Sequence, residues 1–127
     1  MTEIGYIVPK TLPPPLGHYS PAVCANGFVF VSGLLPMTPD GRKMTGEPFD
    51  LQARQVLNNL GEILRSSGTD PSKLVQVRVY LVNLENWPAF NQLYAAWLGD
   101  AKPARCVVPV TALHFGLELE VEAVAAQ

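Results

Sequence analysis

The stretch LVQVRVYLV, residues 74–82, decides the fold class of this chain. Apolar residues alternate along it with polar or aromatic ones, which is the period of a β-strand with one buried face. One face is predicted to carry Val75, Val77, Val79 and Leu81, and the other Gln76, Arg78 and Tyr80. We therefore expect a strand here.

A helix is predicted on each side of this strand. Upstream, apolar residues recur at intervals of three and four between Ala53 and Leu64, which is one face of an amphipathic helix. Asp50 is the expected N-cap of this helix, and Gly68 its end. Downstream, a second helix is expected to begin near Trp87–Pro88, because proline suits a first turn, and to end at Gly99.

The remaining strands lie towards the two ends of the chain. Phe28–Ser32 is a continuous apolar run, which we interpret as a strand buried on both faces. The turn signal Asn26–Gly27 joins it to a partner strand over Ala22–Cys24. Cys106–Val110 and Leu117–Ala125 complete the predicted strands. Ahead of them all, the proline-rich residues 9–21 predict an extended arm or loop.

The resulting order, β-β-α-β-α-β-β, predicts an α+β fold in which one sheet carries both helices on one face. The other face of the sheet must then contact either solvent or another subunit. Its valine-rich alternation favours contact with another subunit. Pro109 places its strand at an edge or in a bulge, because proline cannot donate a ladder hydrogen bond. With 127 residues, the chain is expected to form one domain over residues 1–127.

Composition and charge exclude several classes of partner. The net charge is −2 and lysine and arginine form no run, so nucleic acid is not an expected partner. No apolar stretch approaches the roughly 20 residues of a membrane-spanning helix, and the N-terminus lacks the pattern of a signal peptide. Cys24 and Cys106 form no disulfide framework, which favours a cytoplasmic location. His18 and His114 have no Asp or Cys cluster nearby, so no metal site is expected.

Arg105 is the first candidate for binding chemistry. It lies in KPARC, residues 102–106, where Pro103 stiffens the backbone that presents it. A guanidinium offers a planar fork of donors that matches a carboxylate. The alternative is a surface salt bridge, which is the commoner role of an arginine.

The glutamates at positions 118, 120 and 122 are the second candidate. Their spacing of two residues puts them on one face of a strand. Either this face is solvated, with Arg78 of a neighbouring strand as a partner, or one carboxylate lies in a site and orders a water.

Two further residues have two interpretations each. Tyr19, in GHYS at residues 17–20, is either a donor in a site or a residue at the edge of the core. Cys106 is either a nucleophile or a small buried hydrophobe. The second is favoured, because no histidine base lies near it in the sequence.

Taken together and in order, seven segments resemble the YjgF/RidA family, the reactive intermediate deaminases. They are GHYS at 17–20, VFVSG at 29–33, QARQVLNN at 52–59, VYL at 79–81, FNQLY at 90–94, PAR at 103–105 and LEVEA at 119–123. The PAR segment followed by the EVEA strand is the most specific part of the resemblance.

The resemblance implies a chorismate-mutase-like fold and a homotrimer whose sheets pack into a central β-barrel, with active sites in clefts between subunits. It also implies hydrolysis of 2-aminoacrylate-like enamines and imines to 2-keto acids and ammonia, without a metal or an organic cofactor. An imine is electrophilic once protonated, so positioning and a water-binding carboxylate can suffice.

The resemblance assigns roles residue by residue. Arg105 would bind the substrate carboxylate, and Glu120 would hold and orient the attacking water. The backbone near Cys106 and Val107 would help to place both. The residues that would shape the pocket are Tyr19, Ser32, Gly33 and Asn91.

This sequence departs from the family pattern at several positions. Pro21 and Leu34 stand where glutamine is common. Val107 stands where cysteine is common, with Cys106 one residue earlier, and LHFG at 113–116 replaces a Leu-Pro turn. We expect the changes at Pro21, Leu34 and 113–116 to reshape the pocket, and we take an altered specificity through His114 as a hypothesis.

Three other functions remain open at this point. The chain could form a non-catalytic trimer that binds small carboxylates, or act as a chaperone-like trimer through apolar surface. Ribonuclease activity is the third, and the acidic balance and the lack of a basic patch argue against it.

Overall fold

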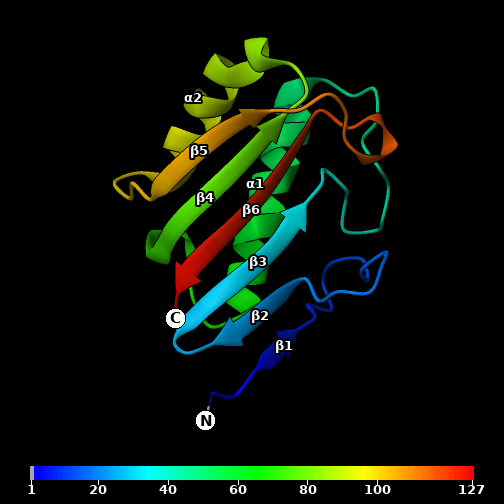
Figure 1. Ribbon diagram of the computed structural model, residues 1–127. Coiled ribbons are helices and arrows are strands. Elements are labelled where there is room, and N and C mark those ends of the chain that lie inside the picture. The colour runs from blue at the N-terminus through cyan, green and yellow to red at the C-terminus, as the bar shows by residue number, and fades with distance from the viewer. Residues whose placement is uncertain (1) are drawn as a thin grey trace.

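The structure, a computed structural model, describes residues 2–127 and places the alternating stretch in a six-stranded sheet as β4 (Leu74–Leu81) (Figure 1). β6 (Leu119–Ala126) pairs with β4 antiparallel, and β5 (Ala104–Pro109) pairs with it parallel on the other side. The sheet continues from β6 through β3 (Phe28–Leu34) and β2 (Ala22–Ala25) to β1 (Gly5–Ile7). β5 is an edge strand, which confirms the expectation from Pro109.

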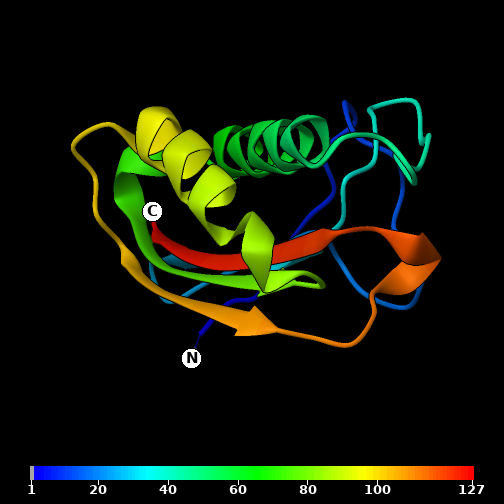
Figure 2. The same cartoon turned by 90° about the horizontal axis from the view of Figure 1, so that it is seen from above.

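Both helices lie on one face of the sheet and leave the other face open (Figure 2). α1 (Phe49–Ser66) packs on β3 and β6, and α2 (Trp87–Leu98) packs beside α1. Short 3₁₀ turns, η1 (Pro71–Lys73), η2 (Leu84–Asn86) and η3 (His114–Gly116), precede β4, α2 and β6. The core fills the space between helices and sheet. The predicted α+β architecture is therefore confirmed.

The prediction that Phe28–Ser32 is buried on both faces is wrong for this chain. Val29 and Val31 are buried under the helices, but Phe28 is 39% exposed and Phe30 is 47% exposed on the open face. An apolar run cannot reveal this difference, because both faces of the strand carry apolar side chains. Only the one-sided placement of the helices separates them.

The predicted alternation fails at one residue of β4. Val77, Val79 and Leu81 are buried as expected, but Val75 is exposed. The pairing with β6 shifts between Leu74 and Gln76, so an irregularity of the ladder turns Val75 away from the core.

Two details of the local structure also differ from expectation. Asp50 is not the N-cap, because α1 begins at Phe49 after Pro48, and Asp50 lies inside the first turn near the positive end of the helix dipole. β1 was not predicted, since three residues are too few to show a period. The start of α2 at Trp87 and its end at Gly99, with φ 66°, agree with prediction.

Two buried amides on α1 tie the helix to the loops around the end of the sheet. Gln52 accepts a hydrogen bond from the backbone N of Glu118 at 3.0 Å and donates one to the carbonyl of Glu47 at 2.9 Å. Asn59 donates to the carbonyl of Met37 at 2.8 Å and accepts from Gln55. These bonds explain why polar residues occupy the buried side of an amphipathic helix.

We expect Gln52→Leu to lower the free energy of unfolding by about 2–4 kcal/mol, because it leaves a backbone donor and acceptor unpaired. Urea denaturation measures this. Gln92→Leu on the exposed side of α2 is the matched control and should stay within about 0.5 kcal/mol. Equal stability of the two variants would contradict the role given to Gln52.

Candidate functional site

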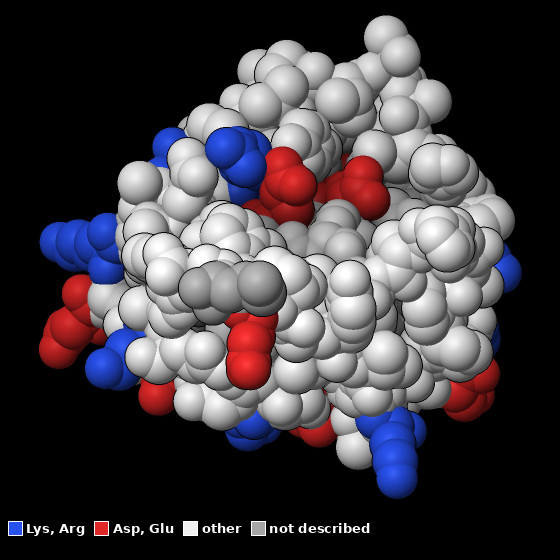
Figure 3. Space-filling view, turned by 60° about the horizontal axis from the view of Figure 1, so that its bottom comes forward, with Lys and Arg blue, Asp and Glu red and all other residues white. Residues whose placement is uncertain are grey.

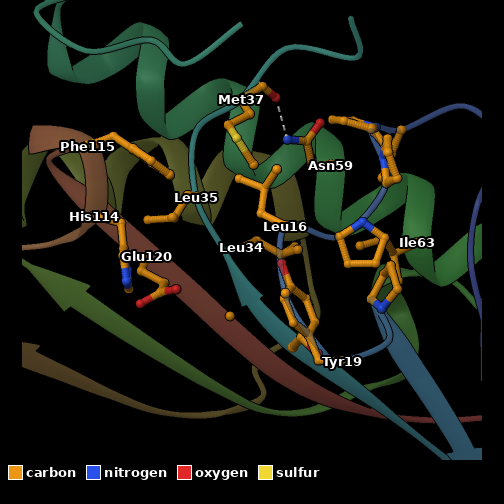
Figure 4. A pocket seen from close by; sticks show the side chains of 18 residues that line it. Leu16, Tyr19, Leu34, Leu35, Met37, Asn59, Ile63, His114, Phe115 and Glu120 are labelled. Atoms are coloured by element: carbon orange, nitrogen blue, oxygen red, sulfur yellow. Dashed lines mark hydrogen bonds between the residues drawn. The ribbon is translucent and has the colours of Figure 1, made fainter. Parts of the chain in front are cut away.

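A cavity of about 560 Å³ opens where β3 and β6 meet the proline arm, residues 9–21 (Figure 4). Its walls come from the arm, the end of β3 and the loop after it, α1, η3 and β6. Four residues predicted for the site line it: Tyr19, Ser32, Gly33 and Glu120. His114 lines it as well, so the structure places the unusual LHFG segment at this cavity.

Gly33 lets the Glu120 carboxylate approach the backbone of β3. A Cβ atom at position 33 would lie 2.6 Å from Glu120 Oε2, so any larger residue there would force the carboxylate to move. Ser32, beside Gly33, binds the proline arm: its backbone N–H donates a hydrogen bond to the Pro21 carbonyl at 3.0 Å. Its Oγ also donates to the Ser20 carbonyl at 2.6 Å. Ser32 and Gly33 thus fix the arm and admit the carboxylate.

The carboxylate of Glu120 has an unusual electrostatic environment. Burial raises the pKa of Glu120, the nearby His114 lowers it in part, and the charge of Glu122 adds to the rise. Figure 4 shows the His114 ring and the Glu120 carboxylate directed into the same part of the cavity. A carboxyl whose pKa is raised can take up and return a proton closer to neutral pH.

Glu122 has different partners from Glu120, although both point to the open face. It accepts a hydrogen bond from Tyr80 at 2.7 Å, and this bond raises the pKa of Tyr80. Arg78 pairs with the same oxygen at 3.5 Å, which agrees for Glu122 with the alternative of a solvated face that pairs with Arg78. Glu122 is therefore a paired residue of the sheet, and Glu120 is the carboxylate of the cavity.

Arg105 is held at a second place, between β5 and α2. Its Nη1 donates to Asn91 Oδ1 at 3.0 Å. The guanidinium carbon lies 4.5 Å from the ring centre of Trp87 and 5.1 Å from that of Tyr94. Within residues 2–127 Arg105 forms no salt bridge, so the commoner role of an arginine is not realised in this chain. The guanidinium N–H groups that do not bind Asn91 can therefore donate to a ligand.

Arg105 and Glu120 lie on opposite faces of the sheet. Arg105 is paired with the buried Val77 on the helix side, whereas Glu120 is paired with Tyr80 on the open side. Since side chains alternate along a strand, one copy of the chain cannot bring both groups to one small molecule.

The other predicted residues divide between these two places. Asn91 joins Arg105, and Val107 packs against the core. Cys106 is exposed on the open face, so the expectation of a small buried hydrophobe is wrong. The reason is that β5 is an edge strand and no helix covers that side.

Sequence reasoning missed the aromatic support of Arg105. Trp87, Asn91 and Tyr94 are spaced by four and three residues, which places them on one side of α2. That spacing was visible in the sequence, but nothing in it indicated that Arg105 packs there. Tyr94 Oη is buried without a hydrogen-bond partner in the described chain, and burial raises the pKa of Tyr94.

Residues 2–127 contain no cluster of three or more His, Cys, Asp or Glu side chains that would hold a metal ion. No helix in the described part of the chain is long and apolar enough to cross a membrane.

Residues 10–127 match the protein family described as Endoribonuclease L-PSP. The chain belongs to this family, the YjgF/RidA family. The resemblance drawn from seven short segments is therefore confirmed, and it covers nearly the whole chain.

Relatives of this RidA-family chain carry more specific names. Reactive Intermediate Deaminase A of Arabidopsis thaliana, a chloroplastic protein, is 39% identical over 89% of this chain and 60% of its own length. The 2-iminobutanoate/2-iminopropanoate deaminase of Rattus norvegicus is 34% identical over 91% of this chain and 84% of its own. The Rid-family protein YyfA of Yersinia pestis has the same fold, with a TM-score of 0.94, 34% identity, and coverage of 98% and 100%.

We expect Glu120→Gln to raise the melting temperature at neutral pH. The folded state holds the proton of Glu120 more tightly than the unfolded chain, so this group's contribution to stability falls as pH rises through the raised pKa. A neutral amide removes that cost, and the gain should shrink as pH falls below this range. Thermal denaturation over pH measures it, with the exposed Glu85→Gln as control. A loss of stability at neutral pH would contradict the assignment.

Proposed function

We propose that this chain is a hydrolase that deaminates reactive enamines and imines of the 2-aminoacrylate and 2-iminopropionate type, giving 2-keto acids and ammonia. One observation carries the proposal. Residues 2–127 hold a guanidinium without a carboxylate partner on one sheet face, and a partly desolvated carboxylate in a cavity on the other. The names of the Arabidopsis and rat relatives support this reaction.

The proposal includes a homotrimer, because the two groups can meet only across an interface. Phe28, Phe30 and Val108 are large apolar residues exposed on the open face, and such a patch is typical of a subunit contact. Figure 3, with the lower side of the molecule brought forward, shows a surface of mostly uncharged side chains around a hollow that contains acidic ones. In this trimer, Arg105 of one copy would face Glu120 of the next.

Each group then has one task. Arg105 binds the carboxylate of the imino acid with its fork of donors, and Trp87 and Asn91 hold the guanidinium so that little entropy is lost on binding. The backbone at Cys106 and Val107 and the Tyr19, Ser32 and Gly33 wall limit how the substrate lies. No metal or organic cofactor takes part.

Glu120 moves the proton in this reaction. It holds a water, accepts its proton as the oxygen adds to C2 of the protonated imine, and gives a carbinolamine. It then returns that proton to the amino nitrogen. As the C–N bond breaks, the C2 hydroxyl gives its proton back to Glu120, and the departing ammonia takes it up, so that ammonium and a 2-keto acid are released. The raised pKa of Glu120 suits both transfers near neutral pH.

Binding without turnover is the alternative, in which the same trimer holds small carboxylates. Saturable binding of 2-ketobutyrate without hydrolysis of any imine would favour it. We do not propose ribonuclease activity, because the net charge is −2 and RNA binding relies on cationic surface. The free thiols of Cys24 and Cys106 suit the cytoplasmic location that we propose.

Arg105→Ala should lower kcat/KM for freshly generated 2-iminobutyrate about a hundredfold, because it removes two charge-assisted hydrogen bonds to the carboxylate. Ammonia release measures the rate, and size-exclusion chromatography checks that the oligomer is intact. Arg54→Ala, an exposed arginine on α1, is the control. Full turnover by Arg105→Ala would refute the role of this residue.

Mixing two inactive variants should restore activity. If each site takes Arg105 from one copy and Glu120 from the next, then unfolding and refolding Arg105→Ala with Glu120→Ala rebuilds about a quarter of the sites. Either variant refolded alone should stay inactive. Mixed oligomers without any activity would show that the two residues do not form one composite site.

A further inference from the structure

The turn between β5 and β6 brings a second titratable side chain to the cavity of Glu120. His114 is the first residue of η3, and it lines this cavity together with Glu120. In Figure 4 the imidazole and the carboxylate point into the same part of the cavity. The proposed deamination gives no task to His114, although an imidazole readily accepts and gives protons near neutral pH.

The local structure of this turn fixes where the imidazole lies. Phe115 has φ 63°, a left-handed conformation that is strained for an aromatic residue, and Gly116 follows with φ 67°. The Thr45 hydroxyl holds the turn by donating to the Phe115 carbonyl at 2.7 Å. Lys43 also lies 4.5 Å from the centre of the Phe115 ring. Backbone strain that is held in this way is typical of functional sites, and here it lies next to His114.

His114 and Glu120 share the cavity without pairing with each other. Residues 2–127 contain three ion pairs, and neither of these two side chains takes part in one. Burial raises the pKa of Glu120, and the charge of His114 lowers it in part, so the two groups interact across the cavity. A substrate atom beside Glu120 therefore has a second proton-carrying group within the same cavity, and neither group is engaged by the other.

We propose that His114 is a second catalytic residue of this deaminase, the base that takes the C2 hydroxyl proton when the carbinolamine breaks down. The inference rests on the proposed function and adds a proton carrier to the same site. His114 takes over the second of the two proton uptakes by Glu120, and Glu120 keeps the activation of water and the protonation of the amino nitrogen.

Atoms and charges balance with both groups in place. Glu120, protonated by the attacking water, gives that proton to the amino nitrogen and becomes a carboxylate again. As the C–N bond breaks, its electron pair leaves with ammonia, the C2–O bond becomes a carbonyl, and the neutral imidazole of His114 takes the hydroxyl proton. The imidazolium then gives this proton to the departing ammonia. Ammonium and a 2-keto acid are released, and both side chains regain their first states.

The test measures kcat and KM for freshly generated 2-iminobutyrate in His114→Ala and His114→Gln. Both variants should lower kcat about tenfold and change KM less than about twofold. A sole acid–base group contributes at least about a hundredfold, and the loss is smaller here because Glu120 can still take up both protons in succession. His18→Ala is the control, since His18 is exposed and does not line the cavity, and it should keep the wild-type kcat.

The glutamine variant and added imidazole separate proton transfer from a merely structural role. Glutamine keeps a side chain that donates and accepts hydrogen bonds, but it does not take up a proton at neutral pH. Imidazole in solution should restore much of the kcat of His114→Ala once the rate without protein is subtracted, and it should not restore that of Glu120→Ala.

The outcomes separate this inference from the proposed function. Wild-type kcat in both His114 variants overturns the inference and leaves the deaminase standing. Wild-type kcat in His114→Gln alone shows a hydrogen-bonding role and overturns the inference as well, and so does a kcat of His114→Ala that imidazole leaves unchanged. If the wild-type chain hydrolyses no imine, the proposed function fails, and the inference fails with it.

Discussion

The one-sided cover of the sheet is the constraint on which the rest of this structure depends. Two helices pack on one face, so every strand sends alternate side chains into two different environments. Residues under the helices form the core, and residues on the other side are left to solvent or to another subunit. The same rule separates Arg105 from Glu120, although their strands are both paired with β4.

This separation changes how the two charged groups are understood. Arg105 is exposed, but its side chain is held in place beside α2. Asn91 and the rings of Trp87 and Tyr94 fix it at the sheet edge, where a planar guanidinium is presented in one orientation. In the trimer that we propose, this geometry would let the edge of one subunit meet the open face of the next.

The two glutamates of β6 show how position decides chemistry. Glu120 and Glu122 lie on the same face and two residues apart. Glu122 is bonded to Tyr80 and paired with Arg78, whereas Glu120 is partly desolvated beside a glycine that leaves room for it. Identical side chains thus differ in environment: Glu122 is paired within the sheet, whereas burial raises the pKa of Glu120 and His114 offsets this rise only in part.

Buried amides of α1 connect the fold to the cavity. Gln52 reaches the entry of β6 and the loop before α1, and Asn59 reaches Met37 in the cavity wall. Both belong to a segment for which the sequence predicted a helix and a family resemblance, but no partner for either amide. The role of these amides depends on hydrogen-bond partners up to 66 residues away in the chain, which no local pattern reveals.

The sequence by itself determined the order of helices and strands from Ala22 onwards, the edge or bulge implied by Pro109, and the family. These features follow from local periodicity, turn residues and short motifs, which act over a few positions. Only the tertiary structure decided that Phe30 is exposed, that Val75 turns outward at a register shift, and that Cys106 is not buried. It also decided that Arg105 and Glu120 face opposite ways. Those outcomes depend on which face the helices cover and on pairing between distant strands, and no local pattern of residues records either.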